Sequence, residues 1–337
     1  MKVISVLCGA CALLFTELAS ASDRLVPSQY PTIQAAINAA VNGDVVQISP
    51  GTHIGPVDFK GKAITVRGST DASTVVISGG MLGSPVVRIW SGESGSSVLD
   101  GVTVTGGRGY QDGGGIAIEN SSPTISNCRI IGNQTGTTNP SNGNTYGGSG
   151  AGILIRGGAP VITNCIIGGN TGRSGGYGAA TGSGICVQGA SAARLQSCSI
   201  TGNKMEGGND SFGAGIYIEG SSTSEFPTFE DCVISGNSLS NGGDGAAMFL
   251  TGPAALTRCR ISQNGGGVVN RISATQVLLR DCNFCGTNAT ITGPFMDLGG
   301  NRFPPVCDAC TGDLNSDGKI DGADLGILLS KWGPCSN

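Results

Sequence analysis

Hydrophobic and polar residues alternate in short segments between Gly113 and Asn288, and the pattern occurs six times. The copy from Gly150 to Asn170 reads GAGILIRGGAPVITNCIIGGN. Each copy contains a G-x-G, a short apolar run, a cysteine between apolar residues and a following asparagine. Self-similarity at this period is typical of a solenoid, in which each unit buries its apolar face against its neighbours. Alternation with period two predicts that the segments are β-strands.

The copies align on one cysteine each. In the copy of Cys165, apolar Ile162 stands three residues before it, Ile167 two after it and Asn170 five after it. The polar residue directly before each cysteine indicates a tight turn. We therefore predict three short strands per copy, stacked about 4.8 Å apart into three parallel sheets. The aligned cysteines, with Cys186, are predicted to be small buried hydrophobes: Cys128, Cys165, Cys198, Cys232, Cys259 and Cys282. The asparagines are predicted to bond along their own stack: Asn133, Asn170, Asn203, Asn237 and Asn264, with Asn288 one place late.

The segment before the repeats predicts a lid for the solenoid. Residues 23–42 contain Ile33, Ile37 and Val41 on one helical face, and Gly43 ends the predicted helix. A solenoid exposes the apolar end of its first coil, which such a helix can cover. Strand-like segments follow at 45–48, 56–59, 63–68, 74–78, 86–90 and 98–107. The only histidine, His53, is predicted to mark a turn.

The first 21 residues predict a secretory signal peptide. Lys2 precedes an apolar core, Val3–Phe15, and Ala19-Ser20-Ala21 fits a cleavage site, so the mature chain is expected to begin near Ser22. The apolar core is shorter than the roughly 20 residues that a transmembrane helix needs. A lipid anchor on Cys11 or Cys8 is the alternative. The predicted location is extracellular or at the cell surface.

Composition narrows the class of protein. The chain has 59 glycines among 337 residues, which suits a fold made of turns. Charged residues make up 12% and the net charge is −4, so no nucleic-acid partner is expected. There are 13 cysteines, and the leader holds two of them. The remaining odd number requires at least one free thiol or an intermolecular pair.

The lid YPTIQAAINAAVNGDVVQISPGTH and the GxGI…C-x-I-x-x-N coils resemble the right-handed parallel β-helix proteins of the pectin-lyase-like superfamily. The coils also resemble the repeats of bacterial autotransporter passengers. The resemblance covers about residues 25–290. It implies an all-β fold over residues 22–306: a right-handed parallel β-helix solenoid with three short strands per coil and an N-terminal capping helix.

The loops between each asparagine and the next G-x-G differ in length and sequence, so these loops are where we expect a binding specificity of this protein to lie. They leave from one corner of each coil and are expected to line up along one edge. We predict that their aromatic and cationic residues bind a polysaccharide: Tyr110, Tyr146, Tyr177, Phe212, Arg108 and Arg173. The alternative is that the rings cover the apolar base of their own loops.

A catalytic constellation is not recognisable in the sequence. The paired aspartates of polygalacturonases and the carboxylate–arginine set of pectin methylesterases are missing, although PGTHIGPVDFKGKAITVRG resembles the first coils of the esterases. Loop carboxylates such as Asp112, Asp210 and Asp244 could form an acid–base pair in space. Whether the chain is an enzyme therefore stays open.

The C-terminal residues 307–337 predict a separate calcium-binding module. Calcium-loop positions 1, 3, 5, 7, 9 and 12 are occupied by Asp313, Asn315, Asp317, Lys319, Asp321 and Asp324, with Gly318 at the sharp turn. With the predicted helix ADLGILLSKW behind it, this loop resembles a dockerin type I repeat. Dockerins of cellulosomes carry two repeats and this chain has one, so a cohesin-like partner is in doubt and an anchoring or sorting role is expected.

Four cysteines lie outside the ladder: Cys285, Cys307, Cys310 and Cys335. Three pairings are possible, and export favours disulfides over a zinc site. Cys285 with Cys307 would pin the linker to the last coil, and Cys310 with Cys335 would close the module. Taken together, the sequence predicts a secreted, non-catalytic protein that binds polysaccharide or a surface partner, with calcium as its cofactor. The alternative is a polysaccharide lyase, esterase or hydrolase.

Overall fold

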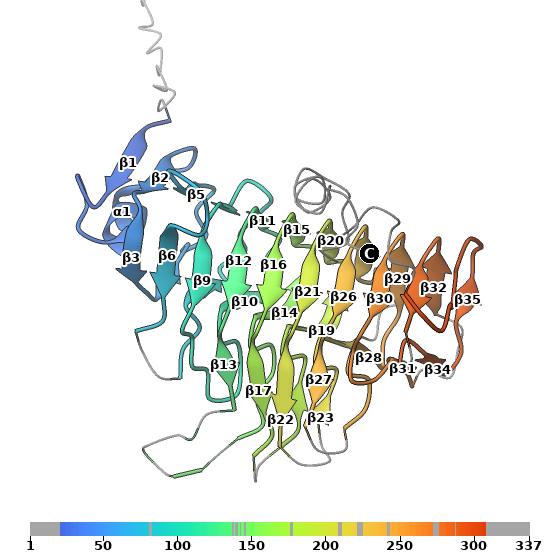
Figure 1. The fold of residues 1–337 in the computed structure, drawn as a ribbon. Helices are drawn as coiled ribbons and strands as arrows, with labels where there is room; N and C mark the ends of the chain where they lie inside the picture. Colours follow the sequence, from blue (N-terminus) through green and yellow to red (C-terminus); the bar gives the residue numbers. More distant parts are fainter. Residues whose placement is uncertain are drawn as a thin grey trace, which may run out of the picture.

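A computed structural model describes residues 21–80, 83–136, 138, 141, 143–144, 146–175, 178–207, 211–220, 225–240, 243–271, 276–286 and 288–307. These residues form an elongated parallel β solenoid, with helix α1 (Ile33–Ala39) at one end and the last strands at the other (Figure 1). The signal peptide, Tyr177, Asp210 and the calcium-binding module from residue 308 onward lie outside the described residues.

Three long parallel sheets run along the solenoid, and each coil contributes a strand to each of them. Sheet A consists of β1 (Asp23–Val26), β2 (Val45–Ile48), β5 (Thr65–Gly68), β8 (Val98–Asp100), β11 (Thr124–Ser126), β15 (Val161–Thr163), β20 (Arg194–Gln196), β25 (Thr228–Glu230), β29 (Ala254–Thr257), β32 (Val277–Arg280) and β35 (Met296–Asp297). Sheet B consists of β3 (Gly51–Ile54), β6 (Val75–Ser78), β9 (Thr103–Thr105), β12 (Arg129–Ile131), β16 (Ile166–Gly168), β21 (Ser199–Thr201), β26 (Val233–Ser235), β30 (Arg260–Ser262) and β33 (Asn283–Cys285). Sheet C consists of β4 (Val57–Asp58), β7 (Val87–Ile89), β10 (Ile116–Glu119), β14 (Ile153–Gly158), β19 (Ile185–Ser191), β24 (Ile216–Glu219), β28 (Met248–Leu250), β31 (Val268–Asn270) and β34 (Ile291–Thr292).

The middle coils add strands that the sequence analysis treated as loop. Sheet D consists of β13 (Gln134–Thr135), β17 (Thr171–Arg173), β22 (Lys204–Glu206) and β27 (Ser238–Leu239), and sheet E of β18 (Ala180–Thr181) and β23 (Ser211–Phe212). They extend to one side of the three main sheets (Figure 1). Met205, Ala180 and Ala214 form a second small core there. The prediction of three sheets is confirmed, and these coils carry a further layer.

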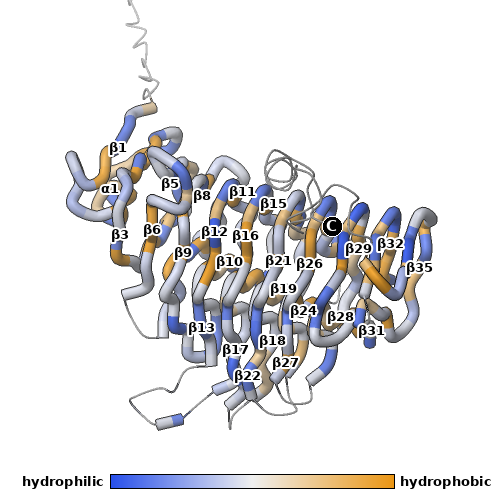
Figure 2. Tube along the Cα trace, in the orientation of Figure 1, coloured by the Kyte–Doolittle hydropathy of each residue, from blue (hydrophilic) through white to orange (hydrophobic). Residues whose placement is uncertain are grey.

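The interior is a set of stacked apolar rows, as the period-two pattern predicts. In sheet B, Ile130 pairs in register with Ile167, which pairs with Ile200, and all three are fully buried. Figure 2 shows the hydrophobic positions along β12, β16 and β26 and the hydrophilic ones along β13 and β17. Burying an isoleucine side chain stabilises a fold by about 1.5–3 kcal/mol, so the rows dominate the stability of the solenoid.

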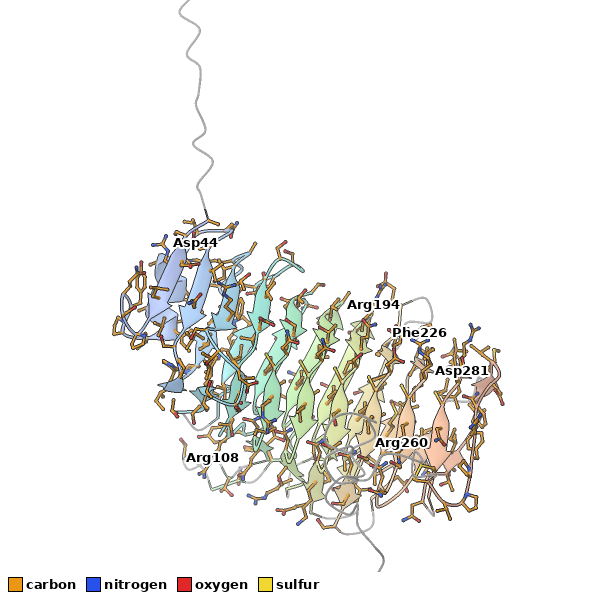
Figure 3. The ribbon with its side chains drawn as sticks, turned by 45° about the horizontal axis from the view of Figure 1, so that its top comes forward. Asp44, Arg108, Arg194, Phe226, Arg260 and Asp281 are labelled. Atoms are coloured by element: carbon orange, nitrogen blue, oxygen red, sulfur yellow. A yellow bond between two sulfur atoms is a disulfide. The ribbon has the colours of Figure 1, made fainter. Side chains whose placement is uncertain are left out.

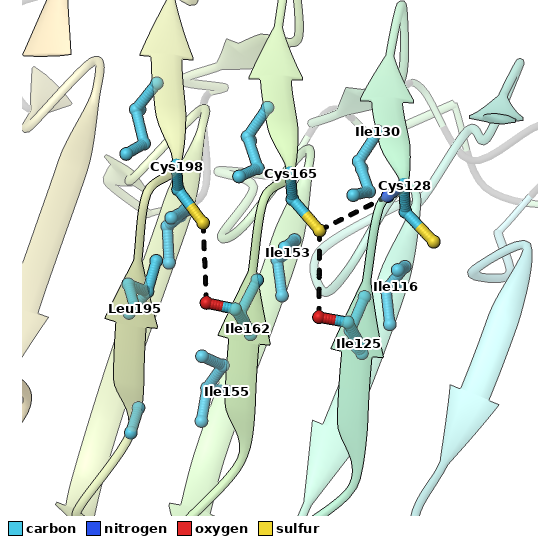
Figure 4. Packing of buried hydrophobic residues seen from close by; sticks show 14 of the residues in the cluster. Ile116, Ile125, Cys128, Ile130, Ile153, Ile155, Ile162, Cys165, Leu195 and Cys198 are labelled. Atoms are coloured by element: carbon cyan, nitrogen blue, oxygen red, sulfur yellow. Dashed lines mark hydrogen bonds between the residues drawn. The ribbon is translucent and has the colours of Figure 1, made fainter. Parts of the chain in front are cut away.

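The cysteine ladder belongs to this interior. All seven cysteines predicted to be fillers are buried and free. Cys165 Sγ lies 3.4 Å from the backbone nitrogen of Cys128 and 3.7 Å from the carbonyl oxygen of Ile125 (Figure 4). Burial raises the pKa of Cys186 to about 12. The six aligned cysteines are all buried in the main apolar core, which confirms that they pack as small hydrophobes.

The residue before each ladder cysteine adopts a left-handed backbone conformation, with φ of 52° or 53° at Asn127, Asn164, Ser197, Asp231, Arg258 and Asp281. This conformation turns the chain from sheet A into sheet B within one residue. Asparagine tolerates it best among residues with a side chain, which explains the two asparagines. The predicted tight turn is confirmed.

The buried asparagines explain the second glycine of each G-x-G. Asn203 Nδ2 donates to Asn237 Oδ1 at 3.0 Å, and Asn170 Nδ2 donates to Asn203 Oδ1 at 3.0 Å. A Cβ atom on Gly184 would lie 2.9 Å from Asn203 Nδ2 and 2.4 Å from the carbonyl oxygen of Gly215. The first glycine of that motif, Gly182, needs φ of +58°. One glycine therefore makes the bend, and the other leaves room for the amide ladder.

The N-terminal lid is confirmed with different boundaries. Thr32 caps α1 by accepting from the backbone nitrogen of Ala35, and Ile33 and Ile37 are buried in the main core. Val41 is 49% exposed and lies beyond the helix, which ends at Ala39. The segment also contains β1, which pairs with β2 and was not predicted. His53 lies within β3, in register with buried Ile77, so its prediction as a turn residue was wrong.

Candidate functional site

The outer face of sheet C carries a continuous row of polar side chains. Alternation along β10 points Ile118 inward and Glu119 outward, and the register pairs Glu119 with Arg156, Arg156 with Gln188, and Gln188 with Glu219. We call these four residues the C-face row. Arg156 Nη1 lies 3.4 Å from Glu119 Oε1, Arg156 Nε donates to Gln188 Oε1 at 3.0 Å, and Gln188 Nε2 donates to Glu219 Oε2 at 3.4 Å. The row is thus linked across four coils.

A second row runs beside it, formed by the residue that directly precedes the bending glycine of each coil, Gly113, Gly150, Gly182, Gly213 or Gly245. Parallel bridges join Asp112 to Ser149, Ser149 to Thr181, Thr181 to Phe212, and Phe212 to Asp244. We call these five residues the ledge row. The expectation that the loops line up along one edge is confirmed for these positions. The ledge row contacts sheet C where Asp112 binds Arg156 and Phe212 packs on Phe249, and Asp244 binds Arg271 just after β31.

Arg156 is the electrostatic centre of this face. Its guanidinium lies 2.5 Å from Asp112 Oδ1 and 3.4 Å from Glu119 Oε1, so one cation joins the ledge row to the C-face row. Burial alone would lower the pKa of Arg156, but the two carboxylates raise it above its ordinary value. The three side chains keep between 36% and 42% of their surface exposed, so a ligand can reach them.

Aromatic rings lie two coils further along. Phe249 contacts Phe212 with a centroid distance of 4.7 Å and stacks on Tyr217 at 5.9 Å with planes 5° apart. Tyr217 is half-buried beside Glu219, and burial followed by the negative charge of Glu219 raises the pKa of its hydroxyl. At the other side of Glu119, Trp90 is 40% exposed and carries Arg88 over its ring at 4.9 Å. The face thus has aromatic rings toward both ends of a central stretch of hydrogen-bonding groups.

The aromatic residues predicted from the sequence do not share one row. Of the four, Phe212 lies in the ledge row, at the position that Thr181, Ser149 and Asp112 take in earlier coils. The Tyr110 ring packs over the backbone of Gly83. The hydroxyl of half-buried Tyr146 lies 3.4 Å from Asn144 Nδ2.

The two predicted arginines lie elsewhere in the loop region. Arg108 is exposed, next to Gln134, and Figure 3 shows it at the edge of the solenoid opposite Arg194. Arg173 pairs with Glu206 on sheet D at 3.0 Å. Neither is among the residues that contact Arg156, whose recorded ionic partners are Asp112 and Glu119.

The sequence analysis missed the C-face row. A signal for it exists, because IAIE, ILIR, ICVQ and IYIE end on a polar residue four positions after the last glycine of each G-x-G. Period-two alternation places that residue outside. The pattern does not say that the neighbouring ledge row leaves this side chain accessible.

The remaining predictions about metals and thiols divide as follows. Cys285 and Cys307 form a disulfide, which confirms one of the predicted pairs. Cys310, Cys335 and all six predicted calcium ligands lie outside the described residues. Within the described ranges, no group of three His, Cys, Asp or Glu side chains is placed to hold a metal ion. Nor does the described part contain a helix of the length and apolarity needed to cross a membrane.

Comparison with known proteins identifies the architecture. The family described as "Right handed beta helix region" matches residues 136–284. No curated protein sequence matches the chain. Among solved structures, a pectin methylesterase in complex with a hexasaccharide is similar over 94% of this chain and 99% of its own, at 11% identity and a TM-score of 0.53. The pectin methylesterase PemA from Erwinia chrysanthemi is similar over 83% and 93%, at 10% identity and a TM-score of 0.52. The chain therefore has the right-handed parallel β-helix fold, which these pectin methylesterases share.

Proposed function

We propose that this protein acts on a polysaccharide that lies along the outer face of sheet C, beside the ledge row. The observation that carries the proposal is the Asp112–Arg156–Glu119 cluster, continued by Gln188 to Glu219. Carboxylate, amide and guanidinium groups bind sugar hydroxyls, and the neighbouring rings of Tyr217 and Trp90 offer stacking surfaces. Rings and polar groups spaced over several coils suit an extended sugar chain better than a small molecule.

The cluster also suits acid–base chemistry. Asp112 and Glu119 both bind the guanidinium of Arg156. A ligand that displaces one of these carboxylates from Arg156 would leave the two in different surroundings. Either carboxylate could then transfer a proton at a sugar oxygen or an ester, since general acid–base catalysis requires a positioned carboxyl within hydrogen-bond reach. The fold shared with pectin methylesterases supports an enzyme in this class, of which lyase, esterase and hydrolase are the members considered.

A non-catalytic polysaccharide-binding protein is the second candidate. It is favoured by the pairing of Asp112 and Glu119 with Arg156, because a carboxylate held in an ion pair is a weaker base than a free one. Under this alternative the C-face row serves only to bind hydroxyls. The two candidates share a binding surface and differ in whether product is released.

The test is a panel of polysaccharides assayed for both retention and product release. Arg156→Ala is expected to weaken retention about tenfold, or about 1.4 kcal/mol. Arg258→Ala is the matched control, because Arg258 also binds two carboxylates, Glu230 and Asp231, but at the turn between sheets A and B. Equal retention by both variants would reject the C face as the binding surface.

A second pair of variants separates the two candidates. Asp112→Asn and Glu119→Gln keep the shape of the side chains and remove their charge. Unchanged retention with loss of product release indicates an enzyme. If no polysaccharide gives product with the unmodified protein, while the C face still binds, the non-catalytic candidate stands.

We also propose that residues 1–21 direct export and that residues 307–337 bind calcium through the six predicted loop ligands. The acidic loop supports the second proposal, since calcium prefers carboxylate and carbonyl oxygens. In this scheme the calcium-bound module anchors or sorts the exported protein, through a cohesin-like or other surface partner. Pull-down from a cell-envelope fraction with and without a calcium chelator tests this role, and calcium-independent capture would reject it.

A further inference from the structure

The C-terminal end of the solenoid is apolar and incompletely covered. A cavity of about 510 Å³ is lined there by Gly286, Ala289, Thr290, Ile291, Phe295, Phe303, Pro304 and Pro305. Of the eight large hydrophobic side chains exposed in the described residues, four lie within the last twelve: Met296, Leu298, Phe303 and Val306. Apolar residues gathered on an open surface in this way mark a place where something packs.

The chain already bends part of the way over this end. Phe303 stacks on buried Phe284 with a centroid distance of 5.1 Å and lies 6.2 Å from the ring of Phe295. Phe303 nevertheless keeps 48% of its surface exposed. At the opposite end, α1 covers the first coils with Ile33 and Ile37. A solenoid needs a cover at both ends, and the described residues provide a helix at only one.

The segment that follows Cys307 has the complementary surface. Its predicted helix ADLGILLSKW places Leu325, Leu328, Leu329 and Trp332 at positions i, i+3, i+4 and i+7, which form one apolar face. An apolar face of this kind is stabilised when it packs on another apolar surface.

The disulfide fixes where this segment starts. Cys307 is bonded to Cys285, the neighbour of the cavity residue Gly286, and a Cβ atom on Gly286 would lie 3.8 Å from Cys307 Sγ. Residue 325 is 18 positions further along, a reach of up to about 60 Å. A tethered segment of this kind has an effective concentration in the millimolar range at the cavity, so a modest apolar contact is enough to hold it.

We propose that the C-terminal segment folds back and seats the apolar face of residues 325–332 on this cavity, as the second end cover of the solenoid. The inference does not rest on the polysaccharide proposal. It gives the module a structural role toward its own chain, with its calcium loop facing outward. It also predicts that anything bound by the module is held at the end of the solenoid.

The fluorescence of Trp332 tests whether residues 325–332 are seated on the cavity. The full chain has two tryptophans, so Trp90→Phe leaves Trp332 as the only one. In calcium-containing buffer, we expect blue-shifted emission from Trp332 and quenching by iodide several-fold weaker than for free tryptophan. Phe295→Asp in this background should restore full quenching. Ile166→Asp is the matched control, because Ile166 is also exposed but lies on the outer face of sheet B, and it should leave the quenching low.

Two further measurements keep the proposal falsifiable if Phe295→Asp fails to fold. Leu328→Asp changes the segment and not the solenoid, and it should raise binding of a hydrophobic dye by uncovering the cavity. Light scattering over a wide dilution range distinguishes the chain's own segment from that of a second copy. Free quenching of Trp332 in the folded protein, unchanged dye binding, or shielding that disappears on dilution would each overturn the proposal.

Discussion

Replacing Asn203 with alanine should destabilise the solenoid more than any exposed substitution in the same coil. Asn203 is fully buried. Its Nδ2 donates to the carbonyl oxygen of Ile167 at 2.9 Å and to Asn237 Oδ1 at 3.0 Å. Its Oδ1 accepts from the backbone nitrogen of Asn170 at 3.1 Å and from Asn170 Nδ2 at 3.0 Å. The substitution removes all four bonds and keeps the one from the backbone nitrogen of Asn203 to Asn237.

The magnitude follows from the groups left behind. In the buried interior, the backbone nitrogen of Asn170 loses its acceptor, Asn170 Nδ2 keeps only the carbonyl oxygen of Ile130, and the carbonyl of Ile167 loses one donor. A buried unsatisfied group costs about 1–3 kcal/mol, so we expect a loss of about 3–5 kcal/mol in the free energy of unfolding. Gln196→Ala is the control in the same coil, because Gln196 is exposed on the outer face of sheet A, and it should cost less than about 0.5 kcal/mol.

Guanidinium unfolding followed by circular dichroism measures the change, and hydrogen exchange locates it. The amide of Asn170 should exchange faster in Asn203→Ala, while distant coils keep their protection, because each coil contacts only its neighbours. A loss below about 1 kcal/mol together with an unchanged Asn170 amide would refute the reasoning. It would mean that the amide ladder is not what satisfies these backbone groups.

Four other outcomes are expected. Gly184→Ala should cost about 1–3 kcal/mol, since its Cβ would meet a backbone oxygen and the Asn203 amide; normal thermal stability would contradict this. Hydrogen bonds from Ser22, Val41 and Arg24 hold the pKa of buried Asp44 well below its usual range despite its burial. The resulting stability should be complete above about pH 4 and lost as the pH falls further; a melting-temperature gap to Asp44→Asn that persists unchanged at low pH would disagree. Cys186 and the six ladder thiols should resist a thiol reagent at pH 8 until the protein unfolds; rapid labelling of the native protein would contradict their burial. Asp313→Ala should abolish terbium luminescence sensitised by the full chain; undiminished emission would place the ion elsewhere.

The interior could be predicted from the sequence because every coil needs the same residue types at the same buried and turn positions. Each coil has residues equivalent to Cys165, Ile167 and Asn170 at the same positions. A periodic sequence pattern therefore predicts which side chains stack on one another in adjacent coils. The same logic fails where a coil is unique. Strand β1 is four residues long and is paired by β2, a contact that no local pattern announces.

The site depends on contacts that the sequence does not contain. Alternation predicts that Glu119 and Arg156 point outward, but all three main sheets have outward residues. Asp112 reaches Arg156 from 44 positions earlier in the chain, and contacts such as this one and Phe212–Phe249 place the ledge row beside sheet C. Loop aromatics such as Tyr110 and Tyr146 recur before several G-x-G motifs in the sequence, but their loops differ in length and place them in different surroundings.

The equal stacking of the coils fixes the distances at which this surface can present its groups. Arg156 and Glu219 belong to coils separated by one intervening coil, that of Gln188, and so lie about two coil spacings, or about 10 Å, apart along the axis. Removing one whole coil would keep every interior row in register and bring the two groups one step closer. A point substitution can change which side chain a coil presents, but it does not change the spacing between coils. Selectivity for the length of a bound polymer would therefore change in whole-coil increments, through duplication or deletion of about thirty residues at a time.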